Sequence, residues 1–215
     1  MIERDFCRPG DSMTSSTSFS DFSTAILVSM FADLQSLEDI HHFMDEAQER
    51  SFTDKERRAV VGTSMEYCSF EKATILLNAW GRDIVFDLVD MAMFWQNRAA
   101  VEAALPYIVQ LPAVEMKKLA LDAAVEGFTN VLNAIAPFLD TDEQAMLMID
   151  GSHFDDVREA IYAICDKPQM IKRLMDHQRA DLAQWVEDRY RPEYEQSLLT
   201  EAVGPIERSG AGRKI

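Results

Sequence analysis

Histidines and carboxylates are the residues of this 215-residue chain that could carry acid–base or metal chemistry. His41 and His42 stand beside Asp39 and Asp45, a combination that could hold a metal ion or transfer a proton. Adjacent residues of a helix point about 100° apart, so these two imidazoles do not converge on one point. We therefore expect no catalytic residue, no metal and no cofactor. An enzyme or metal protein that uses His41 and His42 is kept as a third hypothesis, beside the two binding functions given at the end of this section.

The other motifs of catalysis are missing from the sequence. It contains no glycine-rich phosphate loop, no GxSxG, no HExxH and no cluster of Cys and His with metal-ligand spacing. Cys7, Cys68 and Cys165 are an odd number without CxxC spacing, which favours free thiols in a reducing cytoplasm over a disulfide framework. The sequence indicates that the protein is not an enzyme.

Acidic residues outnumber basic ones by 37 to 21, a formal net charge of −16. This charge disfavours direct binding to nucleic acid or to an anionic membrane and favours a basic partner. The acids are unevenly distributed: residues 9–49 hold eight acids and no Lys or Arg, and residues 119–166 hold ten acids against Arg158. The acids that we predict to bind a partner are Asp122, Glu126, Asp140, Asp142, Glu143, Asp155 and Asp156.

Helix capping offers a plainer explanation for five of those acids. Acidic side chains are favoured in the first turn of a helix by its dipole and its free N–H groups. Asp140, Asp142, Glu143, Asp155 and Asp156 all precede or begin apolar periodic segments. The sequence is compatible with both interpretations, helix caps and a negative surface that steers a basic protein.

Aromatic residues near position 95 are a second candidate surface. No single helix face can bury Met93, Phe94 and Trp95 together, so at least one of them should be exposed. Trp95, Gln96 and Asn97 lie where a turn is expected, and we predict that these three residues also contact the partner.

Helical periodicity dominates after about Ser20, and neither alternating strand patterns nor hairpin turn signals are present. We expect an all-α fold of roughly ten helices. Thr53 with Glu56, and Thr141 with Gln144, have the spacing of capping boxes. The apolar run from Ala25 to Phe31 is too short to cross a membrane.

Four segments share a triple of apolar residues at i, i+4 and i+7. Their first members are 28, 30 and 26 residues apart, and a helix with small residues precedes each by about twelve positions. An unrelated helical bundle could also produce such triples, but the pairing favours stacked helix–turn–helix units. The triples are Ala73, Leu77 and Trp80; Val101, Leu105 and Ile108; Val131, Ile135 and Phe138; and Val157, Ile161 and Ile164.

Two segments, DLVDMAMFWQNRAAVEAALPYI and LALDAAVEGFTNVLNAIAPFL, resemble ankyrin repeats, and the resemblance covers about residues 37–166. Each has an inner helix rich in apolar residues, a short turn at Asn97 or Gly127, and an outer helix beginning near Val101 or Val131. The resemblance implies a short α-solenoid whose turns present binding residues, with His153 supporting a turn. Spacings below the ankyrin period of about 33 residues leave open short connections between pairs instead of projecting hairpins.

Four regions follow from this pattern. We predict a loose segment over residues 1–20, a helical repeat domain over 21–166, C-terminal capping helices over 167–203 and a disordered tail over 204–215. In the cap, one long helical stretch from Pro168 to Tyr190 would bury Met170, Leu174, Leu182, Trp185 and Val186. A docking or dimerisation helix is the alternative for this stretch.

The sequence as a whole predicts a non-catalytic, cytoplasmic module that binds another protein, with a basic surface, through a concave or acidic face. The alternative is an acidic inhibitor or immunity protein of phage or bacterial type, which would mimic nucleic acid or block a basic active site. Binding to nucleic acid itself or to a membrane is not expected.

Overall fold

The computed structural model describes residues 23–34 and 36–203, and within these ranges every regular element is a helix. The predicted loose segment over residues 1–20, which includes Cys7, and the predicted tail 204–215 lie outside the described residues. The all-α prediction is confirmed. Two compact units divide the chain between Phe138 and Leu139. This division falls inside the predicted repeat region 21–166, whose limits stay a prediction.

The N-terminal unit consists of eight α-helices and two 3-10 helices among its described residues. In chain order they are α1 (Thr24–Asp33), α2 (Leu37–Arg50), α3 (Asp54–Ser64), η2 (Met65–Tyr67), α4 (Phe70–Trp80), α5 (Arg82–Phe94), α6 (Arg98–Ile108), α7 (Ala113–Glu126), α8 (Thr129–Ile135) and η3 (Ala136–Phe138).

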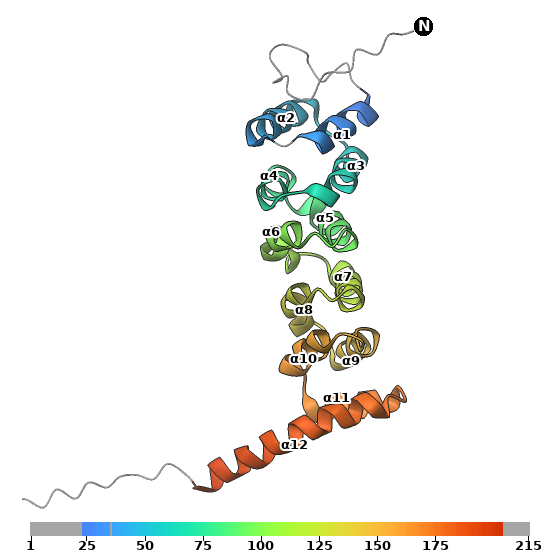
Figure 1. The fold of residues 1–215 in the computed structure, drawn as a ribbon, viewed down its shortest axis with the longest axis vertical. Helices are drawn as coiled ribbons and strands as arrows, with labels where there is room; N and C mark the ends of the chain where they lie inside the picture. Colours follow the sequence, from blue (N-terminus) through green and yellow to red (C-terminus); the bar gives the residue numbers. More distant parts are fainter. Residues whose placement is uncertain (1–22, 35, 204–215) are drawn as a thin grey trace, which may run out of the picture. The chain divides into compact units, whose positions relative to one another are not determined.

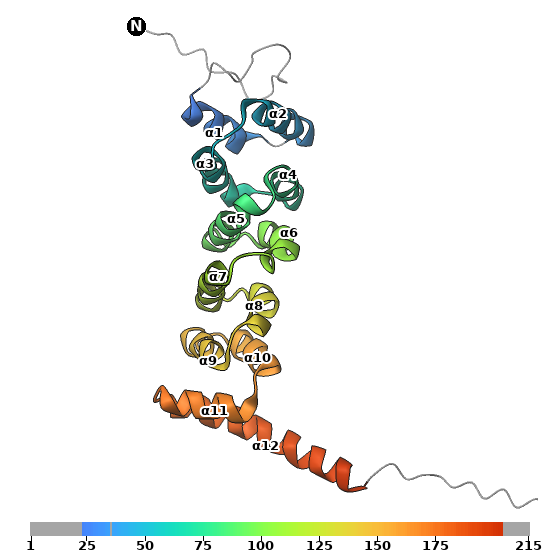
Figure 2. The ribbon, with the colours of Figure 1, turned by 180° about the vertical axis from the view of Figure 1, so that it is seen from behind.

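These helices form two layers, visible in Figure 1 and from behind in Figure 2. In the odd layer α1 packs on α3, α3 on α5 and α5 on α7. In the even layer α2 packs on α4, α4 on α6 and α6 on α8. Each helix therefore buries its apolar stripe against the corresponding helix of the next pair, which is how stacked helical units share one core.

The core confirms most of the predicted apolar anchors. Ala73, Leu77 and Trp80 are buried, as are Val101 and Ile108, and Leu105 is half-buried. Phe138 is a correction, because 63% of its surface is exposed. The α-helix ends at Ile135 and a 3-10 turn containing Pro137 follows, so the i+7 position no longer lies on the buried face.

Connections between successive pairs are short. Gly81 alone joins α4 to α5, with φ of 55° and ψ of −135°, a conformation that a side chain would strain. Residues 109–112 join α6 to α7. These connections are short loops, the alternative to projecting hairpins that the repeat spacing left open.

The C-terminal unit contains α9 (Thr141–Asp150), α10 (Asp155–Ile164), α11 (Lys167–Asp176) and α12 (Ala180–Val203). Helix α9 packs against α10 and α11, and α11 packs against α12. Ile164 is a second corrected anchor: it is exposed at the end of α10, and the next residue, Cys165, is buried instead.

The predicted continuous helix from Pro168 to Tyr190 is interrupted. Gln178 has a left-handed φ of 60°, and the Arg179 N–H donates to the Leu174 carbonyl at 2.8 Å, which ends α11 and reverses the chain. Met170, Leu174, Leu182 and Val186 are buried and Trp185 is half-buried, as predicted. From residue 191 to 198, every residue of α12 is exposed.

The Lys72 side chain connects α4 of the even layer to the end of α1 in the odd layer. Its ammonium group is buried and donates to the carbonyl oxygens of Phe31 at 2.8 Å and Leu34 at 3.1 Å, at the C-terminal end of α1. It also lies 4.4 Å from the centre of the Phe31 ring. Burial lowers the pKa of Lys72, while the α1 carbonyls and the nearby Asp33 carboxylate favour its charge.

Replacing this lysine tests the link. Lys72→Met should lower the free energy of unfolding by about 1–3 kcal/mol, because buried carbonyls lose a charged donor. Lys55→Met, at an exposed position of α3, is the matched control and should change it by less than about 0.5 kcal/mol. Urea denaturation followed by circular dichroism measures both values. Equal stabilities of the two variants would contradict the role given to Lys72.

Candidate functional site

The turns that end α5 and α7 have the same hydrogen bonding. After α5, Gln96 has a φ of 54° and the Asn97 N–H donates to the Ala92 carbonyl at 2.8 Å. After α7, Gly127 has a φ of 78° and the Phe128 N–H donates to the Ala123 carbonyl at 2.8 Å. Both are left-handed helix endings, 31 residues apart, at which the chain reverses into the second helix of a pair.

Asn97 connects its own turn to that of the preceding pair. Its Nδ2 donates to the carbonyl oxygens of Met65 at 2.7 Å and Cys68 at 2.8 Å, and its Oδ1 accepts from the Ala100 N–H at 3.1 Å. Both ends of the amide are therefore used inside the unit. Asn97 was predicted to contact a partner, and its observed hydrogen bonds are structural.

Gln96 makes the next connection along the unit. Its Nε2 donates to Glu126 Oε2 at 2.9 Å and to the Met93 carbonyl at 3.3 Å. The turns of three successive pairs are thus joined by side-chain hydrogen bonds. We call this set of turns, residues 64–69, 94–97 and 125–128, the turn edge.

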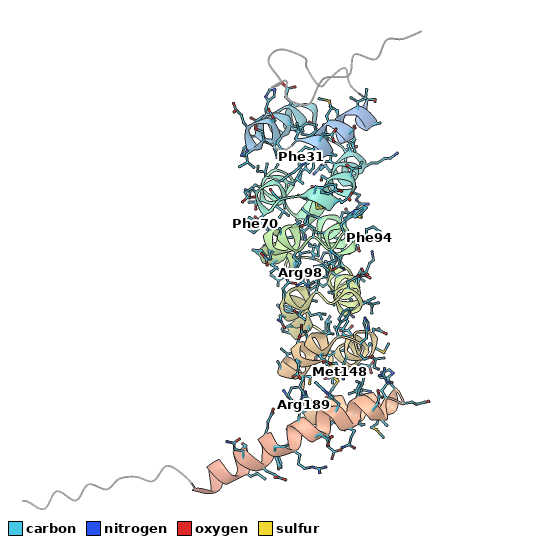
Figure 3. The ribbon with its side chains drawn as sticks, in the orientation of Figure 1. Phe31, Phe70, Phe94, Arg98, Met148 and Arg189 are labelled. Carbon is cyan, nitrogen blue, oxygen red and sulfur yellow. The ribbon has the colours of Figure 1, made fainter. Side chains whose placement is uncertain are left out.

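Large aromatic side chains are exposed along the turn edge. Tyr67 has 77% of its surface exposed, Phe94 68% and Trp95 41%, and Met93 is buried. The Phe94 and Trp95 rings contact each other edge to face, with centroids 5.3 Å apart. In Figure 3 Phe94 lies beside α5 on the side away from α6, whereas Phe70 lies beside α4 on the opposite side of the unit. The expectation that Met93, Phe94 and Trp95 cannot all be buried is confirmed.

Carboxylates accompany these rings. Glu66 is exposed next to Tyr67, and hydrogen bonding to the Glu66 carboxylate raises the pKa of the Tyr67 phenol. Glu126 is exposed and keeps further acceptor capacity beyond its bond from Gln96. The turn edge thus combines aromatic faces with negative charge.

The acids on the outer face of α5 differ, because they are paired with neighbouring helices. Asp83 accepts from Arg57 at 2.7 Å, Asp87 from Arg58 at 3.0 Å, and Asp90 lies 3.4 Å from the Lys118 ammonium. Such partly exposed pairs contribute little to stability but neutralise much of the face's charge.

Asp122, a predicted partner-binding residue, lies half-buried on α7. Burial raises its pKa, and the adjacent Asp90 carboxylate raises it further. Its Oδ2 atom is buried, and side-chain hydrogen bonding with Asp90 also raises the pKa of Asp122. Asp122 therefore faces the contact between α5 and α7 and contributes less to the outer surface than the prediction assumed.

The five predicted acids of the C-terminal unit lie at helix starts. Asp140 and Glu143 form a capping box: the Glu143 N–H donates to Asp140 at 2.8 Å, and the Asp140 N–H donates to Glu143 at 3.0 Å. This box lies one residue before the predicted pair of Thr141 and Gln144, because Asp140 supplies the capping oxygen.

Two more of these acids pair with basic side chains. Asp142 Oδ1 is 3.2 Å from His177 Nε2 and 3.9 Å from Arg173 Nε, and Asp155 forms an ion pair with Arg158. Asp156 is exposed in the first turn of α10. The capping explanation thus accounts for Asp140 and Glu143, and ion pairing for Asp142 and Asp155.

The described histidines lie in three separate parts of the chain, on α2, in the turn before α10 and at the end of α11. His41 and His42 are both exposed on α2, and within residues 23–34 and 36–203 no group of three or more His, Cys, Asp or Glu side chains is arranged to hold a metal ion. His153 lies in the turn before α10, where its ring is 4.2 Å from that of Phe154. In the same part of the chain, every helix is too short or too polar to span a bilayer.

Tyr67 and Glu66 were absent from the predicted site. The periodic pattern places them at the end of α3, and nothing in the sequence indicates that a 3-10 turn will present them beside the Asn97 turn. The Asn97 amide makes this contact by binding main-chain carbonyls, and any residue can supply those.

Comparison with protein-family models, with curated proteins and with solved structures found no match to this chain.

The link between turns gives a stability prediction. Asn97→Ala removes an N-cap and two hydrogen bonds to half-buried carbonyls, and should lower the free energy of unfolding by about 1–3 kcal/mol. Glu126→Gln keeps an acceptor for Gln96 and should change it by less than about 0.5 kcal/mol. Thermal and urea unfolding compare the two variants. A fully stable Asn97→Ala variant would mean that the turns are not coupled through this side chain.

Proposed function

We propose that this chain is a non-catalytic protein-interaction module whose turn edge binds a protein with a basic surface. The observation that carries the proposal is the exposure of Tyr67, Phe94 and Trp95 beside Glu66 and Glu126 on a fixed edge. Exposed aromatic side chains that cluster are typical of binding surfaces, and Trp and Tyr are enriched among residues that dominate binding energy.

The rigidity of the edge supports the same function. Its turns are held by the bonds of Asn97 and Gln96, so little backbone freedom would be lost on association. The net charge of −16 would attract a basic partner over distance and repel nucleic acid. The short α-solenoid with ankyrin-like turns is part of this proposal, and the layered packing and the recurring left-handed turns support it.

The mimic or immunity-protein alternative receives less support from the geometry. Its main basis was the acidic window 119–166, and within it Asp140, Glu143, Asp142 and Asp155 already serve as caps or in ion pairs. We also propose a cytoplasmic location, because Cys68 and Cys165 are buried free thiols.

Affinity capture with edge variants tests the proposed function. The double variant Phe94→Ser/Trp95→Ser should lose a basic protein that the wild type retains, because it removes the aromatic contact area. Phe70→Ser, at an aromatic residue with 47% of its surface exposed on the opposite side of the unit, is the control and should retain it. Mass spectrometry of the captured proteins at low and high salt is the measurement.

Salt distinguishes the two functions in the same experiment. Binding through aromatic contacts should persist in part at high salt, whereas a purely electrostatic mimic should lose its partner steeply. Identical captured proteins for wild type, double variant and control would contradict the assignment to the turn edge.

A further inference from the structure

We infer that the turn edge recognises arginine side chains on an extended segment of the partner, with Trp95 as the stacking surface and Glu126 and Glu66 as the carboxylates. This inference rests on the proposed function, since it specifies the chemistry of the same edge. It adds two statements, a preference for arginine over lysine and a spacing between the arginines.

The C-terminal unit contains an internal example of the same recognition. The Arg189 guanidinium lies 4.0 Å from the centre of the Trp185 ring and donates to the Glu159 carboxylate at 2.7 Å. Arg158 lies 5.2 Å from the same ring. An indole and a carboxylate from two different helices together hold an arginine here.

The turn edge offers the same two groups. Trp95 presents its indole with 41% of its surface exposed, and the next residue, Gln96, is hydrogen-bonded to the exposed carboxylate of Glu126 on the neighbouring helix. The nearest arginine in sequence, Arg98, lies over the Phe128 ring at 5.6 Å. An arginine supplied by a partner would complete at Trp95 the arrangement that Arg189 completes at Trp185.

Arginine fits these groups better than lysine does. A guanidinium is planar and weakly hydrated, so it can stack on an indole while its N–H groups donate to a carboxylate. A lysine ammonium is a compact, strongly hydrated charge that gains less from an aromatic face. The mixture of rings and carboxylates therefore favours arginine, whereas carboxylates alone would accept either residue.

The stacking of the turns sets the spacing. The turn of Tyr67 and Glu66 is bonded directly to that of Trp95 through Asn97, and the latter to Glu126 through Gln96. Packed helices are about 8–10 Å apart, and an extended chain advances about 3.3 Å per residue. Arginines about three residues apart in an extended segment would therefore meet successive turns.

Peptide binding tests the inference on the full chain. The probe is a fluorescein-labelled peptide with arginine at every third position and serine elsewhere, compared with its lysine counterpart and with a peptide whose arginines are adjacent. Fluorescence anisotropy gives the dissociation constants. In protein labelled with 5-fluorotryptophan, the ¹⁹F resonance of Trp95, assigned with a Trp95→Phe variant, reports on contact.

We expect the spaced arginine peptide to bind about tenfold more tightly than the lysine peptide and to shift the Trp95 resonance. Trp95→Ala should lower the affinity for the arginine peptide to that for the lysine peptide. Glu126→Gln should weaken binding of the arginine peptide several-fold. Phe70→Ala is the control and should leave all affinities unchanged. Circular dichroism verifies that each variant is folded. Trp95→Phe keeps an aromatic ring at this position and should retain part of the preference for arginine over lysine.

The possible results separate the two proposals. Equal affinity for arginine and lysine peptides, with both weakened by Glu126→Gln, would overturn the arginine inference and leave the basic-partner function standing. Equal affinity for spaced and adjacent arginines would overturn the spacing. Failure of both peptides to bind, or binding unaffected by Trp95→Ala and Glu126→Gln, would overturn the proposed function together with the inference.

Discussion

No helix pair of the N-terminal unit can bury its apolar side chains alone, and this constraint determines the rest of that unit. Leu88 and Val89 of α5, for instance, are completely buried on a helix that packs against α3, α6 and α7. Because each pair depends on the next, the helices must repeat at similar intervals and their turns must line up. The aligned turns then form a surface that no single pair could provide.

The side-chain bonds between turns refine this arrangement. Hydrophobic burial fixes how close the helices are, but it is non-directional and does not set the register of the turns. Asn97 and Gln96 supply direction, because hydrogen bonds require specific distances and angles. Gln96 adopts a left-handed conformation in which glycine would be easier, and Gly127 occupies the equivalent position one pair later. Glutamine at position 96 therefore provides a side-chain link to Glu126 that glycine could not provide.

Sequence reasoning predicted the elements that depend on periodicity. The helix pairs, the anchors from Ala73 to Ile108 and the capping box at Thr53 follow from local pattern. The structure contains the pairs and the box, and it buries these anchors except Leu105, which is half-buried. Its errors lie where the pattern ends: Phe138 lies in a 3-10 turn, and the C-terminal stretch reverses at Gln178, where no glycine or proline marks a break. Local pattern carries no information on which conformations tertiary packing selects at such points.

The candidate site was only partly accessible from sequence for a similar reason. Exposed aromatics at Trp95 could be expected from crowding on one helix, and the acids could be counted. Which acids serve as caps, which pair with a neighbouring helix and which remain at the surface depends on contacts between residues far apart in the chain. Asp142 with His177 and Asp87 with Arg58 are such contacts, whereas Glu126 is an exposed predicted acid hydrogen-bonded to Gln96, the residue after Trp95.

The distal part of α12 differs from the layered helices in having no buried residue between positions 191 and 198. Between residues 191 and 198 every residue is exposed, and Pro192 removes one main-chain donor from the helix. This segment therefore gains little from burial, and helices with little tertiary support are marginal in water and melt gradually on heating. As temperature rises, this segment should lose helix in a shallow, non-cooperative slope that precedes the sharp transition of the packed core.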